Sequence, residues 1–106
     1  MIHMAEFIKL FRKNDVQPGQ IKSAYVPSVR NNVAVSGIGG KYYAFLDECP
    51  HMAYRLSNGT VEGNVITCPQ HGSKFDMTTG KALAVSDNPL VMYEVKVEGD
   101  DIYVKV

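Results

Sequence analysis

The chain has 106 residues, the size of one domain with a modest hydrophobic core, so we expect a single domain over residues 1–106. Its 11 basic and 11 acidic residues cancel, which gives no indication of a nucleic-acid partner. No apolar run approaches the length of a membrane span, and no basic-then-apolar leader opens the chain. We therefore expect neither a membrane partner nor a secretory signal.

The first half of the chain predicts β-strands separated by turns. We expect strands at 6–12, 20–26, 33–38 and 41–46, a turn at 14–19 and a loop at 27–32. Gly39-Gly40 predicts a hairpin between the last two strands. Residues 1–4 are expected to be disordered or a cloning remnant, and His3 is given no role.

The second half continues this pattern with shorter segments. Asn58-Gly59, Glu62-Gly63 and the T-T-G at 78–80 are turn signals around a short strand at 64–67. Towards the end of the chain, strict alternation predicts a terminal hairpin. One face of its first strand is expected to carry Val91, Tyr93, Val95 and Val97, and the other Met92, Glu94, Lys96 and Glu98. The alternation is repeated by Ile102, Val104 and Val106. Short strands with frequent turns and no helical periodicity predict an all-β, antiparallel sandwich or barrel.

Two short motifs combine cysteine and histidine. Cys49 and His51 form C-x-H, and Cys68 and His71 form C-x-x-H. These pairs contain both cysteines of the chain and 2 of its 3 histidines. Thiolate sulfur and imidazole nitrogen are ligands for soft or borderline metals. The sequence therefore predicts a metal site with four protein ligands.

Two metals compete for such a site. A Cys₂His₂ set suits structural zinc, but usual zinc spacings place two cysteines on one arm and two histidines on the other. Here each arm is mixed, which fits a two-iron cluster in which each loop gives a cysteine to one iron and a histidine to the other. Replacement of two cysteines by two histidines on one iron of a [2Fe–2S] centre defines the Rieske site. A zinc-stapled interaction module stays as the alternative.

The motifs around these residues resemble those of the Rieske iron–sulfur family. The matching segments are C-P-H at 49–51, L-S-N-G at 56–59, C-P-Q-H-G-S at 68–73, F-D at 75–76 and T-G at 79–80. The resemblance covers nearly the whole chain and implies one [2Fe–2S] cluster per chain, bound by Cys49, His51, Cys68 and His71. It also implies a Rieske-type antiparallel fold with a small cluster-binding subdomain of two loops, at about 47–86.

Four loop residues bear on the reduction potential that the resemblance implies. High-potential members carry an extra cysteine in each loop, where this chain has Tyr54 and Gln70. Phe75 stands where that branch has a tyrosine that donates to a thiolate, and loss of a donor lowers the potential. Ser73 is an opposing indication, because that branch has a serine there that bonds a sulfide. A backbone-bonded loop serine is an equal alternative. We predict a potential near the low end of the Rieske range.

Other loop residues have structural interpretations. Gly72 is expected to allow close approach of the backbone. Asp87-Asn88-Pro89 resembles the proline loop that covers the cluster in this family, although an ordinary turn is equally compatible. Asp47 and Glu48 are expected to form a solvated face or to join a docking rim.

Three functions follow from the resemblance. The first is a one-electron carrier, not an enzyme, which passes electrons from a flavoprotein or other ferredoxin reductase to a terminal oxygenase such as an aromatic-ring hydroxylating dioxygenase. The second, a catalytic oxygenase, needs a 2-His-1-carboxylate iron site, for which only His3 remains. The third is a small subunit similar to that of nitrite reductase. Two cysteines that both bind metal leave none for a disulfide, which fits the cytoplasm.

Overall fold

The computed structural model describes residues 7–50, 54–69, 72–86 and 88–106. The strands are β1 Phe7–Arg12, β2 Ile21–Val26, β3 Asn31–Ile38, β4 Lys41–Leu46, β5 Thr60–Glu62, β6 Val65–Thr67, β7 Lys74–Asp76, β8 Ala82–Ala84, β9 Met92–Glu98 and β10 Asp101–Lys105. The helices in these ranges are two single 3₁₀ turns, η1 Lys13–Asp15 and η2 Leu56–Asn58. The predicted all-β class is confirmed. The expectation for residues 1–4 lies outside the described residues.

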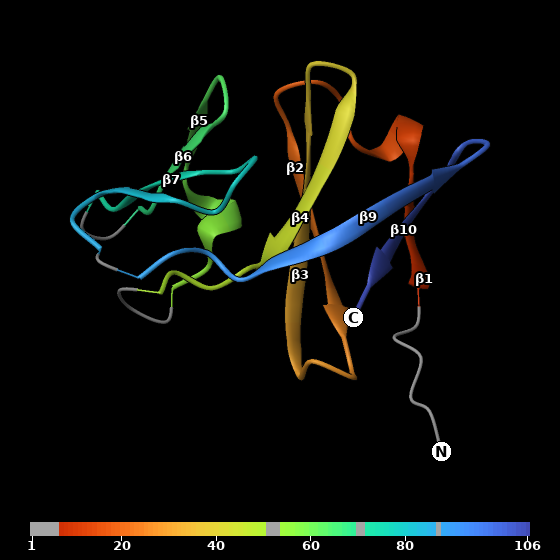
Figure 1. The fold of residues 1–106 in the computed structure, drawn as a ribbon, viewed down its shortest axis with the longest axis horizontal. Helices are drawn as coiled ribbons and strands as arrows, with labels where there is room; N and C mark the ends of the chain where they lie inside the picture. The colour runs from red at the N-terminus through yellow and green to blue at the C-terminus, as the bar shows by residue number, and fades with distance from the viewer. Residues whose placement is uncertain (1–6, 51–53, 70–71, 87) are drawn as a thin grey trace.

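The strands form two antiparallel sheets. A six-stranded sheet in the order β1-β10-β9-β4-β3-β2 curls into a nearly closed barrel. A four-stranded sheet, β5-β6-β7-β8, lies beside it and is called the small sheet below. Figure 1 shows the small sheet on the left and the barrel strands on the right. The chain enters the small sheet after β4 and returns to the barrel at β9, so residues 47–86, predicted to form a cluster-binding subdomain, contain the whole small sheet.

The barrel has an aliphatic core of its own. Its buried residues are Val16, Val26, Val33, Val35, Ala44, Ile102 and Val104. The alternation predicted for the last strand is confirmed, because Ile102 and Val104 are both fully buried. The alternation predicted for the preceding strand is seen at Tyr93 and Val95, which pack against this core. Val91, just before β9, and Val97, near its end, are 50% and 39% exposed.

A second apolar cluster joins the barrel to the small sheet. Its buried members are Ala34, Phe45, Cys49, Leu56, Ile66, Cys68, Phe75, Met77 and Leu90. Ala34 and Phe45 come from barrel strands, and Ile66 and Phe75 come from the small sheet. Met92, predicted to face the opposite way from Tyr93 and Val95, packs against this joining cluster rather than the barrel core. The joining cluster therefore contains both cysteines.

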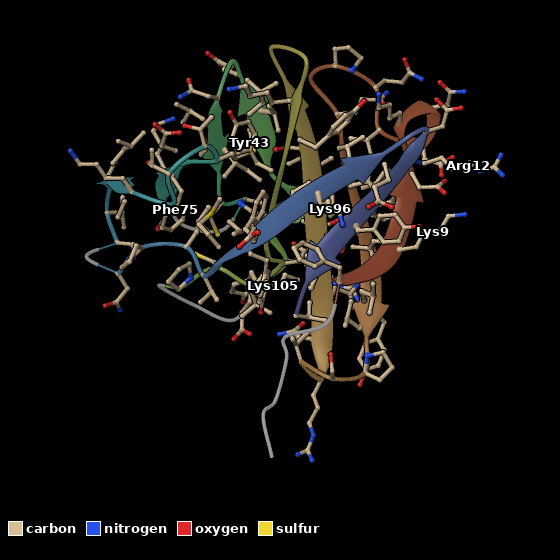
Figure 2. The ribbon with its side chains drawn as sticks, turned by 45° about the vertical axis from the view of Figure 1, so that its right-hand side comes forward. Lys9, Arg12, Tyr43, Phe75, Lys96 and Lys105 are labelled. Carbon is tan, nitrogen blue, oxygen red and sulfur yellow. The ribbon has the colours of Figure 1, made fainter. Side chains whose placement is uncertain are left out.

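Figure 2 shows Phe75 on the small-sheet side of the molecule and Lys9, Lys96 and Lys105 on the barrel strands. The outer barrel face carries the ion pairs Lys9–Asp101, Lys96–Glu98 and Lys105–Glu94. All three are solvent-exposed pairs, a class that contributes little to stability. In the described residues, no helix is long and apolar enough to cross a membrane.

Several predicted boundaries need correction. The hairpin at Gly39-Gly40 is confirmed, with Ile38 paired to Lys41. However, β3 begins at Asn31, inside the predicted loop. The prediction also missed β5 and β8, which have 3 residues each and so offer almost no periodicity to detect.

Candidate metal centre

The first predicted ligand arm leaves the barrel at the end of β4. The Leu46 N–H donates to Val91 O at 2.8 Å, which fixes the strand end, and Cys49 follows three residues later. The Cys49 N–H donates to Tyr54 O at 2.8 Å, and the Cys49 side chain is only 2% exposed. His51 lies outside the described residues. Its predicted role as a ligand stays a prediction.

The second predicted arm is the tip of the β6–β7 hairpin. Thr67 pairs with Lys74 at its base, the Cys68 N–H donates to Ser73 O at 2.7 Å, and the Gly72 N–H donates to Cys68 O at 3.3 Å. Gly72 has φ of +73°, a left-handed value that favours glycine. A Cβ there would meet no protein atom within 4 Å among those described, so the φ angle, rather than close approach to protein backbone, explains this glycine. His71 and Gln70 lie outside the described residues.

The two cysteine side chains are buried in the same apolar environment. Each is 2% exposed, and both belong to the joining cluster with Leu56, Phe75 and Met77. Over the described ranges, no group of three His, Cys, Asp or Glu side chains could hold a metal ion. The described part of the site is thus the cysteine pair, half of the predicted ligand set. Two thiols brought together from separate hairpins suit a sulfur-ligated group such as a [2Fe–2S] cluster.

Ser73 gives a second test of whether the described residues suit a [2Fe–2S] cluster. Its side chain is 0% exposed, and its Oγ has no hydrogen-bond partner among the described residues. A buried hydroxyl without a partner costs about 1–3 kcal/mol, so such a group needs an acceptor. The alternative of a serine bonded to backbone therefore has no support here, and a cluster sulfur is the acceptor that fits. Ser36 on β3 shares this property, and nothing in the structure explains it.

Asp47 is a functional candidate that the sequence reasoning misplaced. The expectation of a solvated or docking face is wrong, because Asp47 is 1% exposed. Its Oδ2 accepts hydrogen bonds from Ser23 Oγ and Ser57 Oγ, each at 2.6 Å, and its Oδ1 accepts one from the Ser57 N–H at 2.8 Å. Glu48 is half-buried and accepts a hydrogen bond from Asn31 Nδ2 at 2.7 Å. In the sequence, the serine of L-S-N-G indicates such an environment for Asp47, because its hydroxyl can donate a hydrogen bond to a nearby carboxylate.

Two glycines in the matched motifs lie where close packing leaves no room for a side chain. A Cβ on Gly59 would lie 2.0 Å from Thr67 O, so the L-S-N-G turn can rest on the end of β6 only without a side chain. A Cβ on Gly80 would lie 2.8 Å from Met92 Cγ, and Gly80 also has φ of +84°. The first approach is between the turn before β5 and the end of β6, and the second is between the turn before β8 and β9, so a side chain at either glycine would push these segments apart.

The predicted proline loop is described except for Asp87, which lies outside the described residues. The Ser86 N–H donates to Ala84 O at 2.8 Å across Val85, whose φ is +69°. This is a γ-turn of the rare, strained form, and strain is greatest for a β-branched residue. The Ser86 Oγ also accepts a hydrogen bond from the Asn88 N–H at 3.1 Å. The covering role of this loop stays a prediction.

Comparisons with known proteins agree with this site. The family model described as the Rieske [2Fe-2S] domain matches residues 6–104. The ferredoxin CarAc of Metapseudomonas resinovorans is 36% identical over 99 residues, which cover 92% of each chain. The ferredoxin component of biphenyl 2,3-dioxygenase from Rhodococcus jostii is 35% identical over 97 residues, which cover 91% of this chain and 89% of that protein.

Among solved structures, a chain from the complex of reduced oxygenase and oxidized ferredoxin in carbazole 1,9a-dioxygenase superposes with a TM-score of 0.86. It is 36% identical, and the match covers 96% of this chain and 94% of that one. The buried cysteine pair, the two-sheet fold and these matches lead to one conclusion: the chain belongs to the Rieske [2Fe-2S] domain family and has one [2Fe–2S] cluster as its cofactor.

Proposed function

We propose that this protein is a one-electron carrier whose [2Fe–2S] cluster is bound by Cys49, His51, Cys68 and His71. The observation that carries the proposal is the burial of Cys49 and Cys68 in one apolar cluster, although they come from different hairpins. The two histidines are included because they complete the C-x-H and C-x-x-H pairs. When bound, such a cluster supplies one-electron oxidation and reduction.

The protein supplies burial and fixed geometry to this group. The cysteine pair is held by backbone hydrogen bonds to Tyr54 O and Ser73 O, which fix the turn at each thiol. Leu56 and Phe75 are 0% exposed beside the thiols and keep that part of the site dry. The relatives are named as ferredoxin components rather than as catalytic subunits. We therefore assign electron transfer, not catalysis, to this chain.

The electron acceptor that we propose is a terminal oxygenase of an aromatic-ring hydroxylating system. Support comes from the similar chain in the carbazole 1,9a-dioxygenase complex, which contains an oxygenase and a ferredoxin. We further propose a flavoprotein or other ferredoxin reductase as the electron donor, and the cytoplasm as the location. From the sequence, the docking surface is proposed to include His51, Met52, Gln70 and His71.

We propose a reduction potential near the low end of the Rieske range of about −150 to +300 mV. Phe75 is fully buried in the joining cluster that also contains both cysteines, and its ring has no hydroxyl to donate to a thiolate. The buried hydroxyl of Ser73 is the opposing indication, and as a single donor we expect it to raise the potential only modestly. A measured value above about +200 mV would contradict this proposal.

The function can be tested by rapid mixing. The reduced protein is mixed without oxygen with the oxidised oxygenase component of a carbazole or biphenyl dioxygenase, and the two iron–sulfur spectra are followed. We expect reoxidation of this protein together with reduction of the oxygenase, and no transfer from a Cys68→Ser control. A reduced protein that holds its electron against every Rieske oxygenase tried would overturn the assignment of the acceptor.

A further inference from the structure

We propose that Asp47 is a positioning residue that fixes the separation of the two cysteine arms and so determines how firmly the cluster is held. This inference rests on the proposed function. It concerns the only carboxylate that is fully buried among the described residues. Asp47 itself is not placed as a ligand, since both of its oxygens are occupied by protein donors.

Asp47 connects the barrel to the turn that follows the first arm. On the barrel side, its N–H donates to Asn32 O on β3 at 2.9 Å, and its Oδ2 accepts from Ser23 Oγ on β2 at 2.6 Å. On the other side, Ser57 in η2 donates both its N–H and its hydroxyl to the same carboxylate. Hydrogen bonds to a charged acceptor contribute more than neutral ones, so this junction is a strong one.

The bonds to Ser57 close the loop that carries the first arm. The loop leaves β4 at Asp47 and arrives at η2 at Ser57, and the carboxylate joins these two ends. Cys49 stands two residues inside this closure, where its N–H donates to Tyr54 O. A loop whose ends are joined has fewer conformations, so its cysteine is presented at a defined position.

The turn that Asp47 anchors also contacts the second arm, through Gly59. Gly59 lies two residues beyond Ser57 and packs so closely on Thr67 O that a Cβ would lie 2.0 Å from it. Thr67 is the residue before Cys68, and Thr60 pairs with it across β5 and β6. Asp47 thus stands two residues from one cysteine, and the turn that it anchors presses against the residue next to the other. The geometry points to one chain of contacts that sets the distance between the arms.

The chain offers a matched pair of variants to test this. Ser57→Ala and Ser23→Ala each remove one hydroxyl that donates to Oδ2 at 2.6 Å, but only Ser57 is on the side of the ligand arms. Asp47→Asn keeps one oxygen acceptor and Asp47→Ala keeps none. Each holoprotein is treated with an iron chelator, and the rate of iron release, the reduced-state EPR spectrum, the potential and the unfolding temperature are measured.

We expect Ser23→Ala to lower the unfolding temperature at least as much as Ser57→Ala, because Ser23 Oγ also accepts a hydrogen bond from Asn32 Nδ2 at 3.2 Å. Iron release should accelerate about 10-fold or more in Ser57→Ala, the effect of one charge-assisted hydrogen bond, and change by less than about 2-fold in Ser23→Ala. Asp47→Ala should release iron fastest, and Asp47→Asn should recover part of the loss. The EPR g-values should shift in the Ser57 and Asp47 variants but not in Ser23→Ala.

Equal iron release and unchanged g-values in Ser57→Ala and Ser23→Ala would overturn the inference, since Asp47 would then only stabilise the fold. If Asp47→Ala fails to fold, the comparison of Ser57→Ala with Ser23→Ala still decides the question. A wild-type protein that binds no iron would instead refute the proposed function, and that result is read before any variant is made.

Discussion

The barrel and the small sheet differ in the length of their strands and in the residues that fill their interiors. The barrel strands have 5 to 8 residues, and their buried core is purely aliphatic. Each strand of the small sheet has only 3 residues, and the cluster that packs it contains both cysteines. The barrel therefore has a hydrophobic core that contains no proposed metal ligand. We expect the small sheet to depend on the metal centre, because the two cysteines proposed as ligands are part of the cluster that packs it.

The strongest test of this difference removes a proposed ligand, Cys68. Cys68→Ser keeps the size of the side chain but loses the thiolate, so we expect complete loss of bound iron. Hydrogen exchange of the variant should remain slow in β3, β4 and β10 and become fast in β6 and β7. Iron and sulfide analysis with exchange mass spectrometry measures both effects. A variant that retains its full iron content would show that Cys68 is not a ligand.

Two buried isoleucines, one in each region, give a matched comparison. Ile102 and Ile66 are both 0% exposed. Ile102→Ala in the barrel should lower the free energy of unfolding by about 2–5 kcal/mol and leave the potential and EPR spectrum unchanged. Ile66→Ala, two residues before Cys68, should instead accelerate loss of iron. Denaturant titrations with iron assays check both, and identical behaviour of the two variants would remove the distinction between the regions.

Gly59 tests the contact between the first-arm turn and the end of β6. Gly59→Ala should destabilise the holoprotein by about 1–3 kcal/mol, because its Cβ forces Thr67 O to move. The control is Gly63→Asn, since Gly63 has φ of +58° with nothing within 4 Å of a built Cβ, and asparagine tolerates that backbone. Thermal unfolding compares the two. A harmless Gly59→Ala variant would mean that the two segments can separate freely.

Acid should weaken the small sheet through Asp76. The hydroxyl of Thr78 lowers the pKa of Asp76 below its ordinary value of 3.8, with further lowering by the Thr78 N–H and Asn64, although burial opposes them. A lowered folded pKa gives stability that is present above the ordinary value and lost as the pH falls through the folded value. Unfolding temperatures measured from about pH 5 to about pH 2 should therefore fall less steeply in Asp76→Asn than in the wild type. If the unfolding temperatures of Asp76→Asn and the wild type fall equally with pH, the ionised Asp76 does not contribute to stability.

The smallest expected effect is on the potential. Phe75→Tyr adds a hydroxyl inside the cluster that contains both cysteines, and a new bond to a thiolate of about 1 kcal/mol would raise a one-electron potential by roughly 40 mV. Ser73→Ala removes the buried hydroxyl and should lower the potential by a similar amount. Protein-film voltammetry measures both shifts. A potential that neither variant changes would place these side chains away from the redox group.

The sequence predicted the barrel better than the small sheet for a physical reason. Strands β9 and β10 alternate in hydrophobicity over five or more residues, so their periodicity is visible without the fold. Strands β5 and β8 are too short to show a period. The cysteines of the site were visible from their spacing, whereas the burial of Asp47 depends on Ser23, a partner 24 residues away that no local pattern indicates.

The most direct test of the central claim is a reduced-state EPR spectrum of freshly purified protein, with iron, sulfide and zinc analysis of the same sample. We predict two irons and two sulfides per chain and a rhombic signal with an average g below that of all-cysteine ferredoxins, as expected for a cluster with two histidine ligands. Stoichiometric zinc with no EPR signal would contradict the account and leave a zinc-stapled binding module.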